Sequence, residues 1–162
     1  MADFRSSGGK EYILRADLNS LGRLQARYGT LGEAVGRLSS VEEMLRIAAE
    51  LINEHFYSVG SAERVTPAAL GAALTGPDLE PLTLAVLEAI GECVGNGAQK
   101  KNEGAAGEEK IPVGRLRNLA VRIGGYDRRE IGLMPLWLLY EEISDAFPAA
   151  KKDDDYDYED VI

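Results

Sequence analysis

The run from Gly95 to Lys110 limits the fold of this chain more than any other part of it. The run contains no apolar residue larger than alanine, and its charged residues are three lysines and three glutamates. Such a segment cannot bury enough apolar surface to offset the conformational entropy that ordering would cost. We therefore expect a flexible linker at 95–110, with a folded segment on each side.

The length of 162 residues suits one ordinary domain with a small addition. The expected organisation begins with a disordered lead at 1–10 and a helical domain at 11–94. After the linker, a helical appendage covers 111–147. Residues 148–162 form a tail so rich in acids that it repels itself, and we expect it to be disordered.

Apolar residues recur mostly at helical spacing, so the expected fold class is mainly α. The exception is Glu11–Arg15, a short strand-like run that gives the small helical domain an N-terminal extended segment. Asp17 is a good N-cap for the next helix, and Gly29 is a good residue to end it.

The strongest local signal is Ser39-Ser40-Val41-Glu42-Glu43, in which Ser40 and Glu43 have the spacing of a capping box and Ser39 with Glu42 is the alternative register. The helix that follows has one continuous apolar stripe, made of Val41, Met44, Leu45, Ala48, Leu51, Ile52 and His55. We expect this helix to anchor the core of the first segment.

Further helix starts are marked by residues suited to the first turn. The expected helices run from Thr66-Pro67 to about Leu74, from about Leu79 to Val94, from Val113 to Ile123, from Asp127 with Glu130 as a capping box, and from Met134-Pro135 to about Phe147.

The net charge of −9 and the pI near 4.7 argue against a nucleic acid or an anionic membrane surface as the partner. A single cysteine excludes an internal disulfide and fits a reducing cytoplasm. No apolar run approaches the length of a membrane span. We therefore expect a cytoplasmic protein.

Residues with catalytic potential are sparse, so we expect no enzyme, no cofactor and no metal. Cys93 ends an apolar helix face and is expected to be a buried thiol, and His55 is the only histidine. Zinc would require more His or Cys ligands than the chain has. Gly95-Asn-Gly-Ala-Gln-Lys-Lys lacks the spacing of a phosphate-binding loop.

The last expected helix carries the only tryptophan and is apolar nearly all round. It either docks on the first segment and completes the core, or it presents aromatic anchors to a partner. Tyr156 and Tyr158 alternate with acids in a tail that either solubilises the chain or contacts a partner. The candidate partner-binding residues are Trp137, Tyr140, Leu133, Leu136, Tyr156 and Tyr158.

The first segment resembles the tail assembly chaperones of long-tailed bacteriophages and gene transfer agents. The resemblance rests on Tyr12–Gly29, on the Ser-Ser-Val-Glu-Glu-Met-Leu-Arg-Ile-Ala helix, and on Thr66-Pro67 with its alanine-rich helix. It covers roughly 11–94, and Gln25 stands where an acid is common in the family. Asp127–Trp137 is similar to the second domain that a translational frameshift adds in many of these chaperones.

The resemblance implies a non-enzymatic chaperone that binds the tape measure protein and recruits tail tube subunits in the cytoplasm of the infected host cell. Such a protein is absent from the mature virion. The competing hypothesis is a small acidic structural adaptor, such as a head–tail connector component that stays in the particle. The oligomeric state, including a homo-oligomer, stays open.

Overall fold

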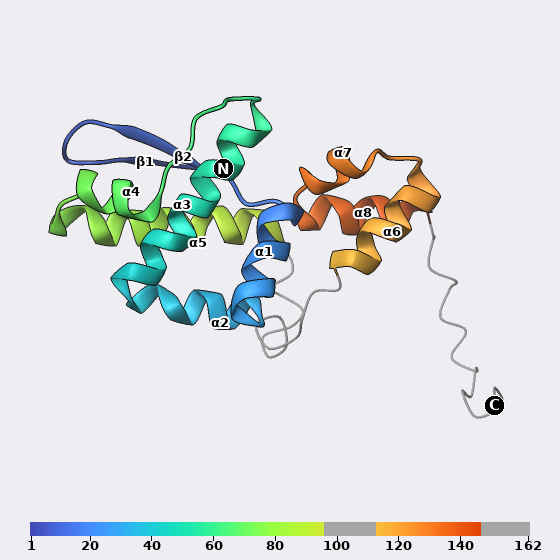
Figure 1. Ribbon diagram of the computed structural model, residues 1–162. Coiled ribbons are helices and arrows are strands. Elements are labelled where there is room, and N and C mark those ends of the chain that lie inside the picture. Colours follow the sequence, from blue (N-terminus) through green and yellow to red (C-terminus); the bar gives the residue numbers. More distant parts are fainter. Residues whose placement is uncertain (96–112, 147–162) are drawn as a thin grey trace.

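The computed structural model describes residues 1–95 and 113–146, and these residues are mainly α-helical, as the sequence predicts (Figure 1). Two strands come first and form an antiparallel hairpin. The elements are β1 (Ala2–Arg5), β2 (Glu11–Leu14), α1 (Leu18–Tyr28), α2 (Leu31–Gly36), η1 (Arg37–Ser39), α3 (Val41–Ser58), α4 (Pro67–Ala73), η2 (Gly76–Asp78), α5 (Leu79–Val94), α6 (Val113–Gly124), α7 (Arg128–Gly132) and α8 (Leu136–Ala146).

The hairpin shows that the prediction of a disordered lead at 1–10 is wrong. Ala2 pairs with Leu14 and Phe4 pairs with Tyr12, and all four side chains are buried. Alternate residues of a strand point to one face, so this face packs on α5 and α3, while the other face carries the exposed Asp3, Arg5 and Glu11. Strand β1 has only two apolar residues. An alternating pattern this short cannot be recognised in the sequence without its partner strand.

Three of the four predicted N-terminal helix caps are confirmed. Asp17 accepts hydrogen bonds from the backbone N–H groups of Asn19 and Ser20, Thr66 accepts one from Ala69, and Asp127 forms a capping box with Glu130.

The capping box predicted for Ser40 and Glu43 is wrong. Ser40 is the N-cap residue of α3, but its side chain makes no capping hydrogen bond. The Glu43 carboxylate instead accepts a hydrogen bond from the Tyr28 hydroxyl at 2.6 Å and pairs with Arg46. The Tyr28 hydroxyl of α1 and the Arg46 guanidinium one turn along α3 have taken the place of the local capping interaction.

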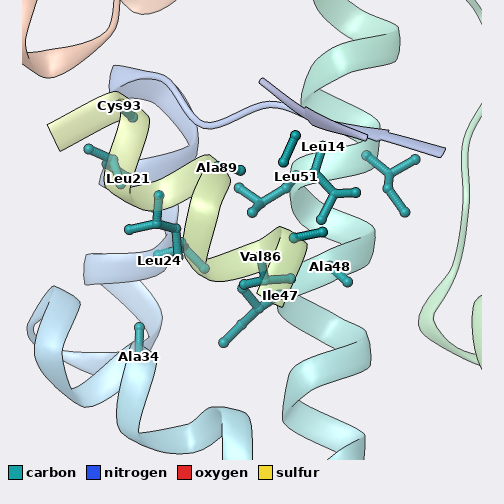
Figure 2. Packing of buried hydrophobic residues seen from close by; sticks show 14 of the residues in the cluster. Leu14, Leu21, Leu24, Ala34, Ile47, Ala48, Leu51, Val86, Ala89 and Cys93 are labelled. Atoms are coloured by element: carbon teal, nitrogen blue, oxygen red, sulfur yellow. The ribbon is translucent and has the colours of Figure 1, made fainter. Parts of the chain in front are cut away.

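Helix α3 lies at the centre of the core, as predicted (Figure 2). The face that it buries is rotated from the apolar stripe predicted from the sequence. Val41, predicted to be in the apolar stripe, is 51% exposed, and Leu45 is only half-buried, whereas Ile47 is fully buried. Figure 2 shows Ile47, Ala48 and Leu51 of α3 close to side chains of α1 and α5. The buried residues of α3 are Met44, Ile47, Ala48, Ala49, Leu51, Ile52 and Glu54.

The second segment is docked on the first. Helix α8 packs against α6 and also against α5, and α7 contacts α1 (Figure 1). The buried residues of 113–146 belong to the same hydrophobic cluster as those of 1–95, and they are Leu116, Ala120, Ile131, Leu136 and Leu139. The interpretation that the last helix docks and completes the core is therefore correct for Leu136 and Leu139 of α8, and Ile131 of α7 is buried in the same core. The predicted linker, apart from Gly95, and the tail at 148–162 lie outside the described residues.

Candidate partner-binding groove

A groove of about 760 Å³ lies where the end of α5 meets the start of α8. Its lining is mainly apolar and comes from both segments of the chain. The lining residues are Met1, Arg15, Ala16, Ala89, Glu92, Cys93, Val94, Gly95, Pro135, Trp137 and Tyr140. A concave apolar surface with a few polar groups at its edge is the usual form of a binding site.

Gly95 allows the two walls of the groove to approach each other. Its φ of +93° is a conformation that favours glycine, and a Cβ added there would lie 2.9 Å from the Cβ of Trp137. Gly95 is also the C-cap of α5, and its N–H donates to the carbonyl of Gly91. One glycine thus ends α5 and admits the first turn of α8.

The predicted binding residues on α8 divide into two groups. Leu136 is buried in the core, whereas Trp137 and Tyr140 are each 44% exposed and line the groove. Leu133 is half-buried and precedes α8, where its backbone carbonyl accepts a hydrogen bond. Leu136 and Leu133 therefore serve docking, and the two aromatic residues form the accessible surface.

The predicted residues in the acidic tail, Tyr156 and Tyr158, lie outside the described residues.

Cys93 lies in the floor of the groove and is the buried thiol that the sequence predicts. Burial raises the pKa of Cys93 to about 11, with the charge of Asp17 acting in the same direction. A hydrogen bond from the backbone of Leu136 opposes the rise and joins α8 to α5 at this point. At neutral pH the sulfur is a protonated packing group rather than a nucleophile.

Polar contacts next to the groove hold the second segment against the start of α1. The Leu18 N–H donates to the Met134 carbonyl at 3.0 Å, and the Arg15 guanidinium donates to the Leu133 carbonyl at 2.6 Å. These bonds fix the turn between α7 and α8, and with it the position of Trp137.

A further contact joins α6 to α1. The Arg117 guanidinium donates to the side-chain oxygen of Asn19. Gly132 of α7 lies so close to this amide that a Cβ would be 2.5 Å from the Asn19 oxygen. Asn19 is therefore enclosed by α6 and α7, and its amide nitrogen faces Glu54 at 3.4 Å.

Two buried carboxyl groups, Asp17 and Glu54, meet beneath these contacts. Asp17 is fully buried and Glu54 is 2% exposed. Burial raises the pKa of Asp17 to about 7, and both the charge of Glu54 and a hydrogen bond with it add to the rise, while the N–H of Ser20 and the charge of Arg15 lower it. The protonated form of Asp17 is therefore more favoured than that of an ordinary aspartate.

The surroundings satisfy this acid pair only in part. Glu54 forms an ion pair with Arg23. The Oδ2 atom of Asp17 has no hydrogen-bond donor among the described residues, and Arg15 Nε lies 3.5 Å from it. Arg15 Nε thus forms an ion pair with Asp17 without a hydrogen bond, and Arg117 Nε is buried without a hydrogen-bond acceptor among the described residues.

His55 is half-buried, and its Nδ1 atom has no hydrogen-bond partner in the described part of the chain. Residues 1–95 and 113–146 contain no group of three or more His, Cys, Asp or Glu side chains placed to hold a metal ion. None of the helices in these ranges is both long and apolar enough to cross a membrane.

The sequence singled out one wall of the groove and missed the other. Trp137 and Tyr140 are conspicuous as exposed aromatic residues, whereas Ala89, Val94 and Pro135 are ordinary small or apolar residues. Their role depends on the contact between α5 and α8, which no local pattern reports. The acid pair was also missed, because Asp17 has the normal pattern of an N-cap and Glu54 that of a solvent-facing glutamate.

Comparisons of the chain with models of protein families, with curated proteins and with solved structures gave no match.

Proposed function

We propose that this protein is a phage tail assembly chaperone that binds the tape measure protein and recruits tail tube subunits. The observation that carries the proposal is the groove between α5 and α8, with Trp137 and Tyr140 on its accessible edge. Aromatic residues at such a position bury a large area for little loss of side-chain entropy, as binding anchors do. The resemblance of 11–94 and of Asp127–Trp137 to the chaperone family supplies the identity of the partners.

The groove suits an α-helix as its occupant. It is too small to enclose a helix, but it can accept the large side chains of an apolar helix face laid across it. The tape measure protein of the family is a long helical rod, so it is the partner that we assign to the groove.

Charge gives the partner helix a second property. The chain as a whole carries a net charge of −9, while Glu92 in the groove lining is paired with the N-terminal amino group of Met1 and Arg15 also lines the groove. A helix with lysine or arginine beside its apolar face would complement the net charge of the chain rather than the groove lining. We therefore expect the partner to be a basic, amphipathic helix.

Co-expression tests this function against the competing one. The chain should co-purify with the tape measure protein of the same phage, keep it from aggregating, and be absent from finished particles. Abundant chain in purified virions would contradict the chaperone and favour the structural adaptor. Failure to co-purify with either the tape measure or the tube protein would contradict both partner assignments.

A further inference from the structure

The groove beside Trp137 presents two kinds of surface to an occupant, and the first is apolar. The small side chains of Ala16, Ala89 and Cys93 line the groove together with the Trp137 ring. A large, rigid side chain covers such a concave apolar surface with little loss of side-chain entropy. An occupant is therefore expected to bring an aromatic or other bulky apolar side chain.

The second kind of surface is the charged edge of the groove. Among the lining residues, the amino group of Met1 pairs with Glu92, which leaves Arg15 without a partner in the lining. Arg15 Nε lies 3.5 Å from the fully buried Asp17, but the Arg15 side chain itself is 27% exposed. Its guanidinium has five N–H donors, and the Leu133 carbonyl accepts from one nitrogen. Carboxylates beside the bulky side chain of an occupant would therefore meet an accessible guanidinium.

The chain contains a segment with both properties. Residues 153–160 have the sequence Asp-Asp-Asp-Tyr-Asp-Tyr-Glu-Asp, in which two tyrosines alternate with six acids. A tyrosine combines a large apolar ring with a polar tip, and here each ring has a carboxylate on either side. This segment therefore supplies aromatic anchors for Trp137 and negative charge for Arg15.

The segment also begins within reach of the groove. Helix α8 ends at Ala146, nine residues after Trp137, which places its end about 14 Å along the helix from that residue. Tyr156 follows Ala146 by ten residues, which span up to about 35 Å when extended. The chain is thus long enough to return along α8. A tether this short gives the segment an effective concentration on the order of millimolar at the groove.

We propose that residues 153–160 of the same chain occupy the groove when no partner is bound. The rings of Tyr156 and Tyr158 cover Trp137, and the neighbouring carboxylates pair with Arg15. This inference rests on the proposed function for the identity of the partner that displaces the segment. The groove is then regulated by competition, because a partner helix and the segment need the same surface.

The charge of the segment gives the displaced state a role as well. A partner helix with lysine or arginine beside its apolar face places the apolar face in the groove. The acids of residues 153–160, once released from Arg15, complement the basic residues of that partner. The segment thus excludes ligands that lack such basic residues and costs a basic helix less.

Trp137 reports the contact, because it is the only tryptophan in the chain and lines the groove. Its emission is measured in the full chain without a partner, with excitation where tyrosine does not absorb, and acrylamide measures its accessibility. Replacing Tyr156 and Tyr158 together with serine should shift the emission to the red and increase the quenching, because the covering rings are lost. Far-UV circular dichroism should be unchanged.

Replacement of the same two tyrosines with phenylalanine is the matched control. Phenylalanine keeps the ring, so the quenching should stay at the wild-type level. Asparagine at Asp155 and Asp157 should give an intermediate increase, because the rings remain while Arg15 loses carboxylates. Sodium chloride at about 0.5 M should act on the wild type in the same way, since salt screens exposed charge pairs.

Four results would contradict the inference. They are equal quenching in the serine variant and the wild type, a phenylalanine variant that behaves like the serine variant, loss of helix in the serine variant, and a difference between variants that disappears on dilution. The last result would show that the segment comes from a second copy of the chain.

Binding of the tape measure protein tests the competition itself. A segment that fills the groove about two-thirds of the time lowers the apparent affinity of a partner about threefold. The serine variant should therefore bind about threefold more tightly than the phenylalanine variant, and equal affinities would contradict the competition. The fluorescence assay contains no partner, so a negative result there would leave the chaperone function standing, and the co-expression experiment judges that function separately.

Discussion

Replacing Leu51 with alanine will lower the free energy of unfolding by about 2–5 kcal/mol. Leu51 is fully buried near the centre of α3, in the cluster that joins α1, α3, α5 and the hairpin (Figure 2). Alanine loses the transfer free energy of the removed atoms and leaves a cavity that rigid neighbours cannot fill. Urea unfolding of the two proteins measures the difference.

Val41→Ala on the same helix is the matched control. Val41 is 51% exposed, so its truncation should change the free energy of unfolding by less than about 0.5 kcal/mol. A similar loss in both variants would show that α3 is rotated relative to the structure, with the stripe predicted from the sequence facing the core.

Raising the pH from 5 to 8 will lower the free energy of unfolding by about 2–3 kcal/mol through Asp17 alone. The pKa of Asp17 is raised to about 7 in the folded protein from its ordinary value of 3.8, which we take for the unfolded chain. A raised pKa of an acid favours the folded state at low pH, and this contribution is lost as the pH rises through 7. Urea unfolding at several pH values measures the slope.

Asp17→Asn should remove most of this pH dependence and make the protein more stable than the wild type at pH 8. Asparagine caps a helix about as well as aspartate, so the bonds to the N–H groups of Asn19 and Ser20 are retained. Asp17→Ala is the control, because it removes the charge and the cap together and should destabilise at low pH. An unchanged slope in Asp17→Asn would show that another group titrates.

The range from pH 5 to pH 8 separates the titration of Asp17 from that of acids whose pKa is lowered in the folded protein. Hydrogen bonds from Thr75 lower the pKa of Asp78 to about 2, and hydrogen bonds from Ser7 act in the same direction. Desolvation by burial opposes this change. Its contribution to stability is present above pH 4 and lost as the pH falls toward 2, which is outside the range from 5 to 8.

Most helices could be predicted from the sequence because their signals are local. Asp17, Thr66-Pro67 and Asp127 with Glu130 each cap a helix through residues no more than three positions away. Helical spacing of apolar residues located α3 and α5 for the same reason. The predicted fold class depends on these local signals, and it is correct.

The errors share a different cause, which is competition from residues far along the chain. Strand β1 forms because Glu11–Leu14 pairs with it and α5 covers it. Glu43 does not cap α3 because Tyr28 binds its carboxylate. Val41 has the spacing of a core residue, but the neighbours of α3 face Ile47 instead.

The site could be predicted only as a pair of aromatic residues. Trp137 and Tyr140 are recognisable on any helix, but the groove needs Ala89 and Gly95, about 45 residues earlier in the chain. The buried polar contacts beside the groove need Asp17 and Glu54 together with Arg117. Each residue has an ordinary role in its own helix. The three become neighbours only when the segment that contains α6, α7 and α8 docks on residues 1–95.

Affinity for the tape measure protein in Trp137→Ala, compared with Leu84→Ala, tests the central claim most directly. Leu84 is 59% exposed on α5 and does not line the groove, so it controls for the loss of an exposed apolar side chain. Removing an anchor should weaken binding at least about tenfold, and Leu84→Ala should bind within about twofold of the wild type. Circular dichroism and urea unfolding should show that residues 1–95 remain folded in both variants. Wild-type affinity in a folded Trp137→Ala variant, or an equal loss in Leu84→Ala, would contradict the groove as the binding site.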